Sequence, residues 1–314
     1  MLEKGADEAR VEIEDASGKI NVTSCSAVQI INERGEYSAT LGLAPLWVRP
    51  YLAQLPWFKT RLASVKKLTG IATARVNERL EHGSDREDLL AKLQNAKDDR
   101  GEQMGKMELI CEALTQLIAG SDTTSNTSCA ILYHLCTNPR AMKKLQAELD
   151  EALRDSEDVP YHTEVQELPY LQAVLSESLR FHSTSAMGLP RCVPQSGATI
   201  SGHRFSEGSV VSVPAYTIHR TQSVFGQDAE EYNPDRWLAP DARKRFEKAF
   251  IPFSVGPRAC VGRNVAMQEL SILIAAIIHR YDVVLKHQDE PLDTIEGFLR
   301  KPTTCEVGIK LRQK

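Results

Sequence analysis

Apolar residues recur every three or four positions along most of the chain, which is the spacing of amphipathic helices. The stretches that show it best are residues 62–82, 106–137, 141–154 and 171–182. Asn138-Pro139 ends the longest of these, because proline disfavours helical backbone in the residue before it. A further helix is expected to follow the loop at 250–262 and to end near Arg280. The pattern therefore predicts a protein built mainly from helices.

The periodicity changes between residues 187 and 213. Short β-rich pieces are separated there by Gly197, Gly202 and Gly208, which predicts the hairpins of a small antiparallel sheet. The region before residue 106 combines helical periodicity with scattered glycine and proline, and its charged end predicts a polar linker or a helix pair. The expected fold class is mainly α with a minor antiparallel β-sheet, in a single domain spanning residues 1–314.

Composition narrows the function mainly by exclusion. With 42% hydrophobic and 25% charged residues, the chain has the make-up of a globular protein large enough to bury a cofactor. Its 38 basic residues balance 42 acidic ones, so no strongly basic surface predicts a nucleic-acid partner. The seven cysteines contain no C-x-x-C pair, which argues against a disulfide framework or a zinc site and favours a reducing compartment.

The N-terminus and the apolar runs bear on membrane association. The first eight residues, MLEKGADE, are charged where a signal peptide or an anchor would be apolar. The apolar run at residues 270–278 is far shorter than a membrane span. The chain as written is therefore expected to cross no membrane and to be cytoplasmic.

The sharpest chemical signal is the segment Phe253-Ser-Val-Gly256-Pro-Arg258-Ala-Cys260-Val-Gly262. A loop that ends at a helix N-terminus offers unpaired N–H groups and the positive end of the dipole, and both stabilise a thiolate. The segment resembles, at every defined position, the F-x-x-G-x-R-x-C-x-G loop of the cytochrome P-450 family. That resemblance implies Cys260 as the axial ligand of a haem iron, Arg258 as a propionate partner, and close approach of the haem at Gly262. A buried structural role is the alternative for a lone cysteine.

The second signal interrupts the longest helix. Residues 119–124, A-G-S-D-T-T, are poor helix formers inside an otherwise apolar helical pattern, and such conflicts mark functional sites. The run resembles the family's A-G-x-D-T-T signature. The resemblance implies a groove for dioxygen at Gly120 and a proton relay through Asp122 and Thr123. Taken alone, a polar patch in a helix is more often a solvated face or a packing kink.

The third signal is Glu177 and Arg180, an E-x-x-R pair whose side chains can meet on one helix face. Exposed pairs at this spacing are common and contribute little stability. The later segment N-P-D-R-W at 233–237 resembles the family's P-E-R-[FW], although Asp235 replaces the usual glutamate. The resemblance implies that Arg236 completes a buried triad which supports the cysteine loop without taking part in catalysis.

Two further residues stand at positions that the family uses. Arg191, in L-P-R, corresponds to a second propionate partner, and the alternative is a surface arginine. His219 recurs at the corresponding place in many members, where a hydrogen-bonded structural histidine is the preferred interpretation.

Beyond the superfamily, the chain resembles the fungal benzoate 4-monooxygenases, or benzoate para-hydroxylases. The segments that carry this resemblance are residues 34–42, 70–80, 114–126, 182–191 and 296–302. It implies para-hydroxylation of benzoate to 4-hydroxybenzoate, with haem b (iron protoporphyrin IX), O2, and electrons from NADPH through NADPH-cytochrome P-450 reductase. Hydroxyls of Ser183, Thr184 and Ser185 are expected to hold the carboxylate of this small aromatic acid. The equal alternative is that they cap the preceding helix.

The family layout assigns a role to each region of the chain. The assignments are substrate-covering helices and a linker at 1–105, an oxygen-groove helix at 106–137, the E-x-x-R helix at 171–182, the small sheet at 187–213, and the cysteine loop with its helix at 250–280. Members begin with a membrane anchor that places them on the cytoplasmic face of the endoplasmic reticulum, so the chain is expected to lack the family's N-terminal part. Two alternatives stay open: a haem-thiolate isomerase or dehydratase that needs no reductase, and an inactive fragment. The intact Asp122-Thr123 pair argues against the first.

Overall fold

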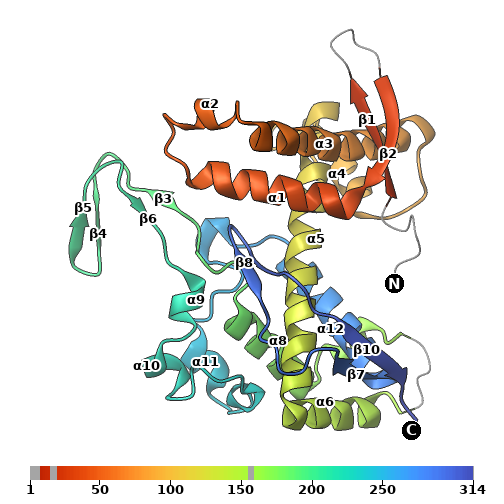
Figure 1. Ribbon diagram of the computed structural model, residues 1–314, viewed down its shortest axis with the longest axis vertical. Coiled ribbons are helices and arrows are strands. Elements are labelled where there is room, and N and C mark those ends of the chain that lie inside the picture. Colours follow the sequence, from red (N-terminus) through yellow and green to blue (C-terminus); the bar gives the residue numbers. More distant parts are fainter. Residues whose placement is uncertain (1–7, 15–19, 155–158, 314) are drawn as a thin grey trace. The chain divides into compact units, whose positions relative to one another are not determined.

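The computed structural model describes residues 8–14, 20–154 and 159–313 (Figure 1). The chain forms two compact units, Met1–Ser121 and Asp122–Lys314. Helices predominate in both, with short antiparallel strand pairs added, so the predicted fold class is confirmed. The single domain expected from the sequence stays a prediction.

The first unit combines a β-hairpin with helices. Its elements are β1 (Glu8–Glu14), β2 (Ile20–Ser26), α1 (Ala27–Leu43), α2 (Arg49–Leu52), α3 (Pro56–His82) and α4 (Leu89–Asn95). Ser26 begins α1 by accepting a hydrogen bond from the Gln29 N–H at 3.2 Å, and Pro56 occupies the first turn of α3. Val11 of β1, Ile30 of α1 and Leu68 of α3 are buried together, which fixes the hairpin against the two helices.

The longest helix, α5 (Lys106–Thr137), has the bounds that the sequence predicts. Its polar middle is helical, and hydroxyl groups there find acceptors in carbonyl oxygens one turn earlier. Ser121 Oγ lies 2.7 Å from the Leu117 oxygen, and Thr127 Oγ1 lies 2.8 Å from the Thr123 oxygen. The conflict in propensity at residues 119–124 is thus resolved within the helix itself.

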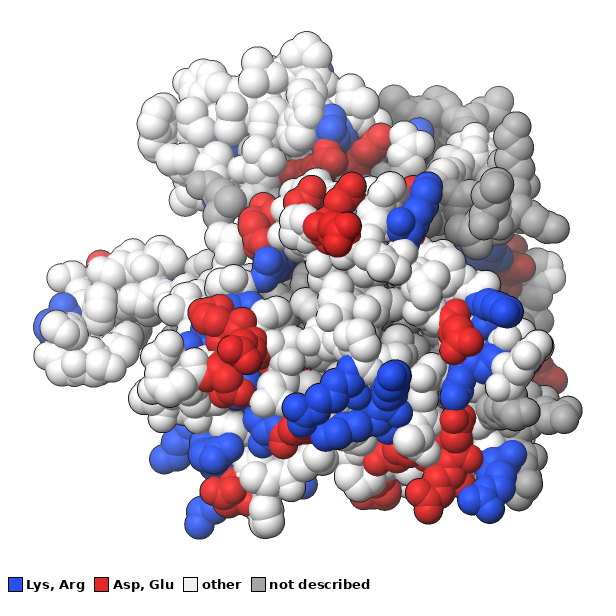
Figure 2. All heavy atoms as spheres, turned by 60° about the horizontal axis from the view of Figure 1, so that its bottom comes forward, with Lys and Arg blue, Asp and Glu red and all other residues white. Residues whose placement is uncertain are grey.

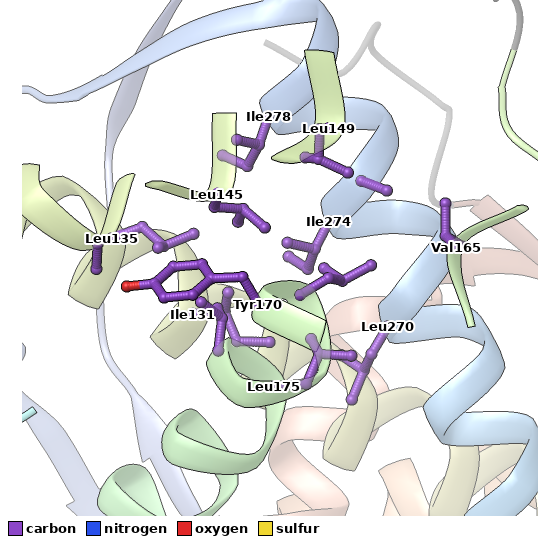
Figure 3. Packing of buried hydrophobic residues seen from close by; sticks show 14 of the residues in the cluster. Ile131, Leu135, Leu145, Leu149, Val165, Tyr170, Leu175, Leu270, Ile274 and Ile278 are labelled. Atoms are coloured by element: carbon purple, nitrogen blue, oxygen red, sulfur yellow. The ribbon is translucent and has the colours of Figure 1, made fainter. Parts of the chain in front are cut away.

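The core of the second unit lies where the end of α5 meets three other helices. These are α6 (Pro139–Ala152), α8 (Pro169–His182) and α12 (Arg263–Arg280), with the short α7 (His162–Val165) beside them. Figure 3 shows Ile131, Leu145, Leu175 and Ile274 pointing toward one another from these helices. All four side chains are fully buried, and at about 25 cal/mol per Å² their burial is the main force that fixes α8 and α12.

The strands of the second unit form four separate antiparallel pairs. They are β3 (Arg191–Cys192) with β6 (Val210–Val211), β4 (Ala198–Ile200) with β5 (His203–Phe205), β7 (Tyr281–Leu285) with β10 (Val307–Leu311), and β8 (Thr294–Glu296) with β9 (Arg300–Pro302). The hairpins predicted for 187–213 are present, but as two separate ladders in place of one sheet. The strands of these two ladders, β3 to β6, are only two or three residues long, so each ladder makes few hydrogen bonds.

Short helical turns connect β6 to α12. They are α9 (Ala215–Ile218), α10 (Gln222–Phe225), η1 (Pro234–Trp237), α11 (Ala242–Phe246) and η2 (Gly256–Arg258). The Phe246 ring stacks on Phe225 at 4.8 Å and meets Trp237 edge-on at 5.0 Å between ring centroids, which gives this meander its own small core. On the face shown in Figure 2, basic and acidic side chains are interspersed. Within the described ranges no helix is both long and apolar enough to span a membrane.

Candidate active site

The cysteine loop, residues 253–262, is shaped by its own backbone hydrogen bonds. The Cys260 N–H donates to the Phe253 oxygen at 2.8 Å, and the Ala259 N–H donates to the Gly256 oxygen at 3.0 Å. Gly256 has a φ of 73°, a conformation that costs any residue with a Cβ about 1–2 kcal/mol. This turn therefore favours glycine at position 256.

The loop presents its cysteine to the exterior. Cys260 is exposed and lies three residues before Arg263, where α12 begins, with Gly262 at the N-cap. A Cβ added at Gly262 would meet the Cys260 sulfur at 3.9 Å, so the glycine leaves the space beside the thiol open. Val255 and Val261 are also exposed. The thiol is thus not the buried structural cysteine that was the alternative.

These residues fit a haem. An exposed thiol near a helix N-terminus supplies a soft anionic ligand, and the apolar Val255 and Val261 supply surface against which a flat apolar group can pack. Arg258 is exposed and available for a propionate. Phe253 is half-buried at the start of the loop, where Arg263 lies over its ring at 5.8 Å.

The proposed proton-relay residues lie on α5. Asp122 is partly buried, and its Oδ1 lies 3.8 Å from the Lys301 ammonium on β9. Sequence reasoning missed Lys301, because no local signal couples two residues so far apart in the chain. Thr123 is half-buried on the same turn, while Gly120 is exposed with open space around its Cα. A groove for dioxygen at Gly120 requires free space beside its Cα, and the structure has that space.

The three residues expected to support the loop meet in the interior. Arg180 and Glu177 are fully buried and form a two-point ion pair, with Nε to Oε2 at 2.9 Å and Nη2 to Oε1 at 2.8 Å. Arg236 Nε lies 3.1 Å from the same Glu177 Oε1. Arg180 also donates to the carbonyl oxygens of His219 and Ala229, each at 2.8 Å. Because every charge is paired and hydrogen-bonded, the desolvation penalty is compensated.

Two members of this network were not predicted. Trp237 Nε1 donates to Glu177 Oε2 at 2.8 Å, and Asp228 Oδ2 lies 3.0 Å from Arg236 Nη2. By contrast, Asp235 points to α6, where it pairs with Arg140 and with Lys144 at 2.8 Å. The replacement of glutamate by aspartate therefore leaves the buried network untouched.

A second chain of hydrogen bonds links α8 to Ile251, two residues before the cysteine loop. His219 is completely buried, and its Nε2 accepts from the Ile251 N–H at 2.9 Å, which puts the ring proton on Nδ1. Nδ1 then donates to Ser183 Oγ at 2.8 Å, and Ser183 donates to the Arg180 oxygen at 2.7 Å. Burial lowers the pKa of His219 to about 3, so the ring is neutral. His219 has the structural role preferred from the sequence.

The proposed carboxylate-binding residues have different environments. Ser183 ends α8 with a φ of 49° and uses its hydroxyl for the contacts just described, which favours the capping alternative. Thr184 Oγ1 lies 2.9 Å from Thr127 Oγ1 of α5, and Ser185 is half-buried. Arg191 is exposed on β3, with Nη1 3.3 Å from the Pro190 oxygen. Its position suits both a propionate partner and a surface arginine.

Comparison with known proteins identifies the family. The cytochrome P-450 family model matches residues 21–309. The chain belongs to the cytochrome P-450 family. The matched residues include the polar run of α5, the E-x-x-R helix and the cysteine loop, and the sequence-based assignment to the family is confirmed.

Individual relatives of this P-450 chain refine the comparison. An Aspergillus niger protein named benzoate 4-monooxygenase is 50% identical over the whole chain, and the match covers 61% of that protein. A cytochrome P-450 monooxygenase of Alternaria alternata is 32% identical, covering 82% of this chain and 71% of its own length. The crystal structure of the haem domain of cytochrome P450DA superposes with a TM-score of 0.78 at 25% identity, covering 91% of this chain and 61% of that one. The chain thus spans about three fifths of the length of its benzoate 4-monooxygenase relative.

Proposed function

We propose that this chain belongs to a haem-dependent monooxygenase that hydroxylates benzoate at the para position. The observation that carries the proposal is the cysteine loop, which exposes the Cys260 thiol beside an open Gly262 at the start of α12. The 50% identity to a protein named benzoate 4-monooxygenase supports the substrate.

The haem would be held by four residues of the cysteine loop and by Arg191 of β3. Cys260 would ligate the iron, Phe253 and Gly262 would face the ring, and Arg258 and Arg191 would pair with the propionates. When bound, haem with a thiolate ligand supplies the activation of dioxygen. The chain's part is to present the Cys260 sulfur to the iron from beside the start of α12, where N–H groups without helical partners and the helix dipole meet the ligand.

The polar turn of α5 would handle protons. The Asp122 carboxylate accepts a proton from solvent and the Thr123 hydroxyl passes one on, and both lie on one turn of a helix that holds them at fixed spacing. The Lys301 ammonium, 3.8 Å from Asp122, orients the carboxylate. Thr123→Ala is expected to keep substrate binding while diverting reducing equivalents to hydrogen peroxide, and Thr124→Ala serves as the matched control.

The substrate carboxylate would meet hydroxyls at the end of α8. Thr184 and Ser185 follow the cap residue Ser183, and the Arg300 N–H donates to the Thr184 oxygen at 2.8 Å. A carboxylate that enters an apolar pocket needs such hydrogen bonds to offset its desolvation. Alanine variants of Ser183, Thr184 and Ser185 test this point, since unchanged benzoate affinity would leave only the capping role.

Electrons would come from NADPH through a cytochrome P-450 reductase, and the complete protein would act at the cytoplasmic face of the endoplasmic reticulum. Family membership and the monooxygenase names of the relatives support this part of the proposal. The experiment supplies the complete protein that contains this chain with haem, reductase, NADPH and benzoate and measures 4-hydroxybenzoate, whereas the 314-residue chain alone is expected to give no product. Product that depends on all four components is expected. Haem-loaded protein that hydroxylates other aromatic acids but not benzoate would contradict the substrate assignment.

A further inference from the structure

A cavity of about 320 Å³ opens between the segment that follows α8, the start of α9 and the hairpin of β8 and β9. Its lining is apolar and aromatic apart from one ion pair. The residues that line it are Ala186, Met187, Pro214, Tyr216, Glu296 and Arg300. Ala186 and Met187 directly follow Ser185, one of the residues expected to meet the substrate carboxylate. A cavity of this composition suits a small molecule with an apolar body and one anionic end.

The backbone of Arg300 is held in place by the end of α8. Its N–H donates to the Thr184 oxygen at 2.8 Å, and His182 Nε2 lies 3.1 Å from the Arg300 oxygen. Lys301, the next residue, turns to α5, where its ammonium lies 3.8 Å from Asp122. Since successive side chains of a strand point to opposite faces, Arg300 turns to the cavity while it stays one residue from the contact with Asp122.

The guanidinium of Arg300 keeps donors available to a ligand. Its Nε lies 2.9 Å from Glu296 Oε1 and 3.3 Å from Thr294 Oγ1. Nη1 and Nη2 have no hydrogen-bond partner among the residues that the structure describes. These two nitrogens carry four of the five N–H donors of a guanidinium. Both can therefore bind a carboxylate that enters from the cavity, while Nε keeps its present partners.

The Tyr216 ring gives the guanidinium a partly dry environment. Arg300 lies over this ring at 4.8 Å, and Arg220 lies over the same ring at 3.6 Å. Arg220 is occupied elsewhere, because it donates to the Phe181 oxygen at 2.6 Å and to Glu230 at 3.0 Å. The aromatic contact replaces water around the Arg300 cation, which lowers the cost of desolvating it when a carboxylate binds.

We propose that Arg300 binds the carboxylate of the aromatic acid substrate, with the ring of the acid against Met187 and Tyr216. This inference rests on the proposed para-hydroxylation. In that reaction the carboxylate lies at the end of the ring opposite the reacting carbon. Its binding residue should therefore be near the relay residues without touching them. Arg300 meets this condition, because its neighbour Lys301 makes the contact with Asp122.

The first test measures equilibrium dialysis of radiolabelled benzoate, and of its neutral counterpart benzamide, with the complete haem-loaded protein that contains this chain. Arg300→Gln should weaken benzoate binding by about tenfold or more, because a charged hydrogen-bonding partner is lost, and should change benzamide binding by less than about twofold. Arg243→Gln, exposed on α11 and outside the cavity, is the matched control and should bind both ligands as the parent does. An equal loss for the two ligands would assign Arg300 a structural role and overturn the inference.

A change at Glu296 should have the opposite sign. Its carboxylate lies 2.9 Å from Arg300 Nε and competes with the substrate for the same cation. Glu296→Gln should therefore raise the affinity for benzoate relative to benzamide, by roughly twofold to tenfold. A lower ratio of the two affinities in this variant would overturn the inference.

Turnover separates this inference from the proposed function. In Arg300→Gln the KM for benzoate should rise by about tenfold or more, while kcat at saturating benzoate changes little. Formation of 4-hydroxybenzoate by the parent, together with an unchanged KM in Arg300→Gln, would overturn the inference and leave the proposed function standing. A haem-loaded parent that neither binds nor hydroxylates benzoate would overturn both.

Discussion

The buried network around Glu177 and the cysteine loop around Cys260 use polar groups in opposite ways. In the network each charged group finds partners within the chain, and Glu177 and Arg180 have no exposed surface. In the loop the thiol, Arg258 and two valines face outward, while only the backbone is internally bonded. The contrast separates groups that hold the fold from groups that are available to a cofactor, although both belong to the same family signature.

The largest expected effect comes from breaking the network. Glu177→Gln leaves Arg180 and Arg236 buried without their carboxylate, which should lower the free energy of unfolding by about 3–5 kcal/mol. Denaturant unfolding of the variant and the parent measures this difference in the free energy of unfolding. The control is Glu230→Gln, which removes an exposed partner of Arg220 and should cost less than about 1 kcal/mol. Equal losses of unfolding free energy in the two variants would show that the buried network contributes no more to stability than a surface ion pair.

Acid should lower stability through the buried region, because the buried region contains histidines and the cysteine loop contains none. Burial lowers the pKa of His134 to about 3, of His182 to about 4 and of His219 to about 3, against an ordinary 6.5. Between pH 6.5 and about 4 the unfolded chain therefore binds more protons than the folded one, and stability falls as pH falls. Each histidine contributes up to about 1.4 kcal/mol per pH unit.

His134→Phe tests this pH dependence, because phenylalanine can keep the stack on Tyr232 but cannot bind a proton. Unfolding measured from pH 7 to 4.5 should show a shallower loss of stability in the variant than in the parent. The same slope in both proteins would mean that His134 does not titrate differently on unfolding.

The loop should respond to backbone change more than to loss of side-chain contacts. Gly256→Ala places a Cβ at a φ of 73° where no atom lies within 4 Å, so strain alone should cost about 1–2 kcal/mol. Gly35→Ala, inside α1 with equally open space, should instead stabilise by up to about 1 kcal/mol. Thermal unfolding of the two variants and the parent compares their stabilities. Stabilisation by Gly256→Ala would contradict the turn geometry.

The smallest effect is expected at Asp235. Its ion pairs with Arg140 and Lys144 lie at the surface, so Asp235→Asn should change stability by less than about 1 kcal/mol. A loss as large as that of Glu177→Gln would place Asp235 within the buried network after all.

The sequence predicted those parts of the fold whose signals are local. The bounds of α5 follow from its long periodicity and from Pro139, and the turn at Gly256 follows from its glycine. The hairpin of β1 and β2 was missed, although Val11 and Ile13 alternate with charged residues, because the region before residue 106 was interpreted by its helical periodicity.

The contacts that could not be predicted join residues distant in sequence. Lys301 beside Asp122 and Asp228 beside Arg236 depend on how strands and meander pack, and no spacing along the chain encodes this. The role of Ser183 as a cap was one of two alternatives, and only the hydrogen bond to His219 distinguishes them.

The central claim is that Cys260 is the residue that ligates haem iron. The most direct test is the absorption spectrum of the reduced, carbon monoxide-bound protein, which reports thiolate ligation. In the full-length protein, the parent and Cys136→Ser should both show the thiolate band, and Cys260→Ala should lose it while its secondary structure is retained, because the exposed thiol supports no buried contact. A thiolate band that persists in Cys260→Ala would contradict the account.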